Sequence, residues 1–176
     1  MRQRIGSSML MWTVYGLVLV ARVVTIAWAA VNLPDNVASH FDASGSANDW
    51  TSRSGYLAFD IGITALMMLG LPMLRGLANG SGAGVNIPNR DYWFRPENRA
   101  TLRRLLTGDL VFIACATGLL LTWLTVSVVV ANQKAEPAMG SWSLMVVLGY
   151  ALVVVGRTVW MKVSRYAVPV GASTRA

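Results

Sequence analysis

The stretch MLMWTVYGLVLVARVVTIAWAAV, residues 9–31, decides the fold, because Arg22 is the one charged side chain in a long apolar run. About 20 mostly apolar residues are enough for a helix to cross the hydrocarbon core of a bilayer. Runs of similar length follow at about residues 56–77, 108–130 and 142–163. We therefore predict an all-α polytopic membrane protein, in which residues 1–176 form a single domain of four transmembrane helices.

The composition supports lipid as the solvent for much of this chain. Hydrophobic residues make up 55% of the sequence and charged residues 13%, whereas soluble domains are about 25% charged. The net charge of +7 is carried beside the apolar runs, which favours topology signals and anionic lipid over nucleic acid. The single cysteine, Cys115, lies inside an apolar run and cannot form an internal disulfide.

The N-terminal run has an alternative interpretation as a cleaved signal peptide. Arg2 and Arg4 supply a basic start, and AWA at residues 27–29 fits a cleavage site. The apolar region of a signal peptide is about 7–15 residues, however, and this run is longer and contains Arg22. We expect an uncleaved first helix.

The basic residues divide unequally between the loops. Those at the N-terminus, in segment 78–107 with its edges and after the fourth run are Arg2, Arg4, Arg75, Arg90, Arg95, Arg99, Arg103, Arg104, Lys162, Arg165 and Arg175. The other two loops carry only Arg53 and Lys134. The positive-inside rule therefore predicts a plasma-membrane protein with cytoplasmic termini, a cytoplasmic basic loop at 78–107 and an outer loop at 32–55.

Four charged residues fall within or at the edges of the predicted spans: Arg22, Asp60, Asp109 and Arg157. Each costs about 2.5–3.5 kcal/mol at a helix centre, so we expect them to be paired. Depth counted at about 1.5 Å per residue predicts an outer Arg22–Asp60 pair and an inner Asp109–Arg157 pair. A proton path would need several acids or histidines in series, and therefore we interpret both pairs as structural.

The segment NIPNRDYWFRPENRATLRRLL, residues 86–106, predicts a turn followed by an interfacial helix. Pro96 suits the first turn of that helix, and Tyr92, Trp93 and Phe94 are typical anchors at the lipid–water boundary. The segment contributes the candidate residues Arg90, Asp91, Tyr92, Trp93, Arg95, Arg99, Arg103 and Arg104. Binding to anionic lipid is favoured over docking of a cytoplasmic partner.

The outer stretch LPDNVASHFDASGSANDW, residues 33–50, is polar and rich in turn residues. His40, Asp42 and Asp49 are too few for a convincing metal site, and the calcium-loop glycine and final acid are missing. We expect no cofactor or metal, a structural His40, and Phe41 and Trp50 packed against the helix ends. The candidate residues of this motif are Pro34, Asp35, His40, Phe41, Asp42, Gly45 and Trp50.

Two segments flanking the second apolar run resemble a known family. LPDNVASHFDASGSANDWTSR, residues 33–53, resembles the signature of the uncharacterised bacterial membrane domain that opens the SdpI-type proteins, and IPNRDYWFRPENR, residues 87–99, is similar to a segment that follows the second helix in such chains. SdpI-type proteins are toxin-immunity and signal-transduction membrane proteins. The resemblance implies a bacterial plasma-membrane protein that binds an extracytoplasmic or membrane protein partner through its outer loop.

Three functions follow as hypotheses. The first is a non-enzymatic binding, immunity or signal-transduction role. The second is an accessory subunit of a larger membrane complex, packing through Gly149 and Gly156, which lie on one side of a helix. The third, a metal-dependent enzyme using His40, comes last because the chain has no HExxH motif or phosphate loop.

Overall fold

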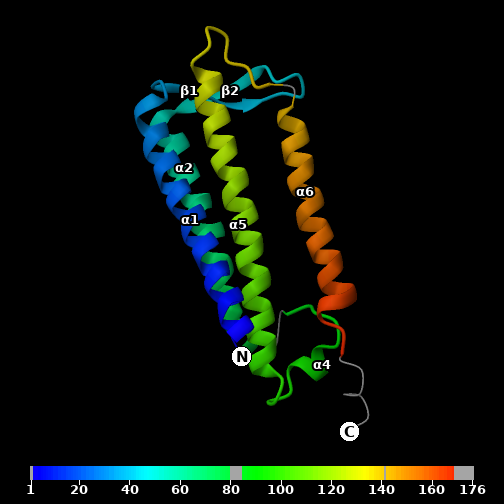
Figure 1. The fold of residues 1–176 in the computed structure, drawn as a ribbon. Coiled ribbons are helices and arrows are strands. Elements are labelled where there is room, and N and C mark those ends of the chain that lie inside the picture. Colours follow the sequence, from blue (N-terminus) through cyan, green and yellow to red (C-terminus); the bar gives the residue numbers. More distant parts are fainter. Residues whose placement is uncertain (1, 80–84, 141, 169–176) are drawn as a thin grey trace.

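The all-α prediction is confirmed by the computed structural model, which describes residues 2–79, 85–140 and 142–168. Four helices of the described chain are long and apolar enough to cross a membrane, over Met9–Asn32, Arg53–Asn79, Arg99–Asn132 and Ser143–Arg165 (Figure 1). The elements in chain order are α1 (Arg2–Asn32), β1 (Asn36–Phe41), β2 (Ala47–Ser52), α2 (Arg53–Ala65), η1 (Leu66–Gly70), α3 (Leu71–Met73), η2 (Leu74–Asn79), α4 (Arg90–Trp93), α5 (Arg99–Asn132), α6 (Ser143–Trp160) and η3 (Met161–Arg165).

Helix α5 is the centre of the bundle. It packs against α1 and against the second span, which runs without a break from α2 to η2. Helix α6 lies beside α5 and away from α1 and the second span (Figure 1). Gly118 of α5 lies at a close contact of three segments, where an added Cβ would lie 2.7 Å from both the Met68 sulfur and a Val18 methyl carbon. A larger residue there would force these side chains to move.

A proline shapes the second span, and the sequence reading overlooked its effect. Pro72 has no N–H to donate to the carbonyl of Met68, four residues earlier. The chain forms a π turn, η1, immediately before the proline segment, and the Tyr15 hydroxyl of α1 donates a hydrogen bond to the free Met68 carbonyl. A carbonyl that would be orphaned in lipid is thereby satisfied by a neighbouring helix.

The outer segment is a β-hairpin, not the irregular loop that the sequence predicted. Strands β1 and β2 pair antiparallel, with register shifts after Ala38 and around His40. Val37 and Ala38 are both buried although they are adjacent, since the irregular register turns neighbouring side chains toward the bundle. Ser52 then caps α2 by accepting a hydrogen bond from the Gly55 N–H. The hairpin lies across one end of the bundle, opposite the beginning of α1 and the short helix α4 (Figure 1).

The prediction of a helix starting at Pro96 is wrong. Pro96 and Glu97 lie in a turn, and α5 begins at Arg99 and continues into the membrane span without interruption. Leu102 and Leu106 of α5 are buried and pack with Trp93 and Tyr166. The sequence GLANGSGAG at 76–84 predicts a flexible tether. Its first residues instead belong to the 3-10 helix η2, and residues 80–84 lie outside the described part.

Candidate functional site

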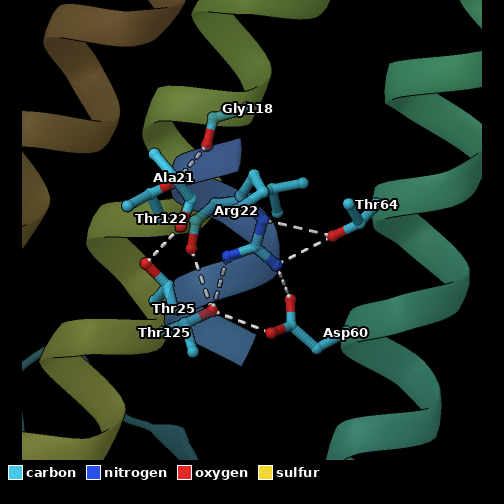
Figure 2. A network of polar contacts seen from close by, with 9 residues as sticks. Ala21, Arg22, Thr25, Asp60, Thr64, Gly118, Thr122 and Thr125 are labelled. Carbon is cyan, nitrogen blue, oxygen red and sulfur yellow. Dashed lines mark hydrogen bonds and ion pairs between the residues drawn. The ribbon is translucent and has the colours of Figure 1, made fainter. Parts of the chain in front are cut away.

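Arg22 and Asp60 meet between the helices, as their depth along the spans predicts. The Arg22 Nη2 lies 2.5 Å from the Asp60 Oδ1, and neither side chain is more than 6% exposed (Figure 2). The pair joins α1 to α2 inside the bundle. A buried charge of this kind persists only when it is paired and its remaining donors and acceptors are bonded.

Two threonines complete this outer cluster, and the sequence reading missed both. Thr64 accepts hydrogen bonds from the Arg22 Nε and Nη2, at 3.2 and 2.8 Å. Thr125 of α5 accepts from the Arg22 Nη1 at 3.0 Å and donates to the Asp60 Oδ2 at 2.9 Å. The cluster thus binds three helices together (Figure 2). Thr64 follows Asp60 by four residues and so shares its helix face, which was a usable signal.

A small cavity connects the outer cluster to the hairpin. It measures about 180 Å³, and Asp60 and Thr125 lie on its wall together with Ser39 of β1, Tyr56 and Met139. Ser39 belongs to the hairpin, whereas Asp60 belongs to the membrane span. A change in the position of the hairpin would therefore alter the surroundings of the buried carboxylate.

The hairpin is fastened to the helices on two sides. The Asn132 side chain at the end of α5 accepts a hydrogen bond from the Ala38 N–H at 2.8 Å and donates one to the Ala38 carbonyl at 3.1 Å. On the other side, the Met139 N–H donates to the Gly45 carbonyl at 2.8 Å. Gly45 has a φ of +88°, and a Cβ there would lie 2.5 Å from the Met139 oxygen. This contact requires glycine in both conformation and size.

Asp42 organises the turn between the strands. Its Oδ1 accepts hydrogen bonds from the Ser44 N–H and hydroxyl, at 2.8 and 2.6 Å, and from the Ser46 N–H at 3.1 Å. The hydrogen bonds from Ser44, and then that from the Ser46 backbone, lower the pKa of the Asp42 carboxyl. Asp42 is therefore a turn-forming residue of the Asx type.

The other motif residues have separate positions. His40 places its Nδ1 2.6 Å from the Asn48 side-chain oxygen, linking the two strands. Asp35 pairs with Arg53 at the exposed start of α2, and Phe41 packs on the buried cluster around Val37. Pro34 precedes β1 and is exposed. Trp50 is 47% exposed, so the prediction that it packs onto the helix ends is wrong.

A metal site finds no support in the described residues. No group of three or more His, Cys, Asp or Glu side chains there is placed to hold a metal ion. The His40 Nδ1 is already engaged with the Asn48 side chain, 2.6 Å away.

The predicted inner pair is part of a larger cluster at the opposite end of the bundle. Asp109 is fully buried and binds Arg157, as the depth count predicts, but it also lies 2.8 Å from the Arg165 Nε and 2.9 Å from the Tyr166 hydroxyl oxygen. Burial, and next the charge of Asp109, raises the pKa of Tyr166, so its hydroxyl stays protonated and donates. Arg165 and Tyr166 stand at the end of the π turn η3 and were not predicted as partners.

The basic and aromatic residues of the segment at 86–106 lie at this same end of the bundle. Trp93 is buried and donates from its Nε1 to the Tyr166 carbonyl at 3.0 Å, so it is a core residue and not the expected interfacial anchor. Arg99 donates to the Phe94 carbonyl at 3.1 Å. The exposed charged residues of the segment are Arg90, Asp91, Arg95, Glu97, Arg103 and Arg104, while Tyr92 is half-buried.

The comparisons with known proteins cover one part of this site. A family described as "Domain of unknown function (DUF1648)" matches residues 17–64. That segment contains the second half of α1, the hairpin and α2 up to Thr64, and so includes Arg22, Asp60 and His40. No curated protein and no solved structure matches the chain. The matched family carries no assigned activity, which leaves the function to be argued from the geometry.

Proposed function

We propose that this chain is a non-enzymatic binding protein of the bacterial plasma membrane, and that its hairpin recognises an extracytoplasmic ligand or peptide in the manner of an SdpI-type immunity or signal-transduction protein. One observation supports it above the others: the hairpin is held rigidly by Asn132 and Met139, yet it presents His40, Asp49 and Trp50 to solvent. An exposed tryptophan on a fixed polar surface is typical of a binding site.

A cavity under the hairpin turn offers a place for a ligand side chain. It has a volume of about 300 Å³ and lies between Phe41, Gly45 and Met139 on one side and Leu144 and Val147 of α6 on the other. Its lining is mainly apolar, with Asp42 at the polar edge. A peptide could place an apolar side chain in the cavity while its backbone meets the polar turn.

A non-enzymatic role agrees with the state of the buried acids. Asp60 is bonded by Arg22 and Thr125, and Asp109 by two arginines and Tyr166. A carboxylate held by cationic donors is a poor general base. Both acids are better suited to holding helices together than to proton transfer.

Photocrosslinking from the hairpin tests the proposal. A photoreactive phenylalanine analogue at Trp50 is expected to form a discrete adduct with an extracytoplasmic protein or peptide in living cells, whereas the same analogue at lipid-facing Val20 forms none. Trp50→Ala in the otherwise unchanged protein should abolish the protection or signal that this partner elicits. Equal adducts from both positions, or a Trp50→Ala variant with full activity, would contradict the proposal.

The orientation of the protein is tested separately, because the recognition role requires the hairpin to face outward. In a Cys115→Ser background, Ala43→Cys is expected to react with an impermeant thiol reagent on intact cells, and Glu97→Cys only after lysis. Both positions are exposed, Ala43 between β1 and β2 and Glu97 between α4 and α5. These pairs of elements lie at opposite ends of the bundle (Figure 1). The reverse labelling pattern would refute the proposed topology.

A second candidate function is that of an accessory subunit, which the exposure of α6 favours. In the described structure no residue of α6 is buried, and a Cβ at Gly149 or Gly156 would have no neighbour within 4 Å. A partner helix could approach closely along this side. Extraction in mild detergent followed by mass spectrometry should then reveal a stoichiometric partner that Gly149→Leu removes and Val155→Ala, at a 58% exposed position on another side of α6, retains.

A further inference from the structure

The inner cluster, formed by Asp109, Arg157, Arg165 and Tyr166, has two positive charges and one negative charge. Asp109 is the one acid bonded to the two arginines, Arg157 and Arg165, so the group retains a charge of about +1. The Asp109 oxygens already accept from both guanidinium groups and from the Tyr166 hydroxyl. The excess charge therefore has no carboxylate partner within the described cluster.

Arg157 also has an unused donor. Its Nε is buried and makes no hydrogen bond in the described structure. The guanidinium carbon lies 4.7 Å from the ring centre of Phe112 and 4.6 Å from that of Trp160, so two aromatic rings lie against the group. A buried, unpaired N–H on a charged group is costly, and a bound acceptor would relieve that cost.

A cavity opens beside these arginines. It has a volume of about 340 Å³ and lies between α1, α5 and the end of the fourth span. Arg157 and Arg165 form its charged wall, and Met11, Val14, Phe112 and Cys115 form the apolar one. Charged and apolar walls in one membrane-facing cavity match the chemistry of a phospholipid, with its anionic headgroup and acyl chain.

The depth of the cavity agrees with this ligand. Arg165 is the last residue of the fourth span, at the end of the bundle where the exposed Arg103 and Arg104 also lie. Basic pockets between helices at such a level bind anionic headgroups. Val14 is 42% exposed on the outer surface of α1, so an acyl chain can enter from the surrounding bilayer.

We infer that the cleft between α1, α5 and α6 binds one anionic phospholipid, with its phosphate on Arg157 and Arg165 and an acyl chain against Val14 and Phe112. The lipid neutralises the surplus charge of the cluster and supplies an acceptor to Arg157. It also fills the space between α6 and the rest of the bundle near Asp109. This site is independent of the role proposed for the hairpin.

Native mass spectrometry of the full chain, delipidated in detergent, tests the site. Titration with phosphatidylglycerol is expected to show one lipid bound at least fivefold more tightly than phosphatidylcholine with the same acyl chains, on the order expected for one basic residue at a headgroup. Arg165→Gln should lose this preference, and Arg104→Gln, at an exposed position of the same end, should keep it. Equal loss in both variants, or no preference in the parent, would overturn the inference.

A second pair of variants leaves every charge in place. Val14→Trp should fill the cavity and abolish the single tight phosphatidylglycerol, while Val20→Trp, on the 61% exposed lipid face of the same helix, should not. Inorganic phosphate separates a lipid from a free anion. Competition by millimolar phosphate, or binding insensitive to Val14→Trp, would overturn the lipid assignment in favour of a phosphate site or general surface attraction.

Discussion

Neutralising Arg22 and Asp60 together should destabilise the protein less than neutralising either one alone. Arg22→Met keeps most of the side-chain volume but removes the charge and every donor, and leaves the 5% exposed Asp60 without a cation. Asp60→Asn removes the carboxylate charge and leaves the fully buried guanidinium of Arg22 without a counter-ion. Either single change leaves an uncompensated charge inside the bundle, which costs about 3–5 kcal/mol.

The double variant carries no buried charge at this level. It loses hydrogen bonds that average about 0.6 kcal/mol each inside membranes, and Arg22 makes four of them, so the expected loss is about 2–3 kcal/mol. Thr125 can still donate to the Leu121 carbonyl, 2.9 Å away. The coupling between the two positions should therefore be at least about 3 kcal/mol.

The assay is reversible unfolding in mixed micelles of mild and denaturing detergent, followed by far-UV circular dichroism. The Arg53–Asp35 pair serves as the matched control, because its side chains are 37% and 92% exposed and its coupling should be about 1 kcal/mol or less. A double variant no more stable than the worse single variant would refute the pairing argument. So would equal coupling in the buried and exposed pairs.

Three further predictions concern the hairpin. Gly45→Ala should destabilise it and release the contact with Met139, seen as faster hydrogen exchange of both amides, because its φ is +88° and the Cβ would clash with a carbonyl. Asn132→Ala should cost about 1–3 kcal/mol, with exchange increased first at the Ala38 amide. The contribution of Asp42 to the stability of the hairpin should be complete above the unfolded pKa of 3.8, and it should be lost as the pH falls through the lower pKa of the folded state. Trp50 fluorescence should report this change with pH, and Asp42→Ala should abolish the change.

The helices were predictable from sequence because lipid imposes a simple rule on every span. A segment in the hydrocarbon core must be long, apolar and internally hydrogen-bonded, so the runs at 9–31 and 142–163 could be located closely. The start of α5 was missed because Pro96 suggested a helix start that the turn before Arg99 already precluded. Length rules constrain the membrane part of a helix and not its extension into water.

The polar partners were less predictable than the charges themselves. Counting residues along each span gave the depths of Arg22 and Asp109, and depth restricted the choice of counter-ion. Thr125 lies far from Arg22 and Asp60 in the sequence. Whether its side chain faces them depends on the rotation of α5 about its axis, which a hydropathy pattern does not determine. The hairpin escaped prediction for a related reason, because adjacent buried residues at Val37 and Ala38 break the alternation that marks a strand.

Charges within a membrane span need partners, and the two charge clusters supply those partners in different ways. The outer cluster is closed: Arg22 is fully buried, and each of its three nitrogens has a partner on α2 or α5. The inner cluster is open, with Arg157 and Arg165 each about a fifth exposed and lining a cavity. The closed cluster has no free arginine donor to offer a ligand, and so Arg22→Met should lower stability without changing lipid binding. An open one can exchange its ligand, and so Arg165→Gln, which leaves Asp109 paired with Arg157, should change lipid binding with a smaller loss of stability.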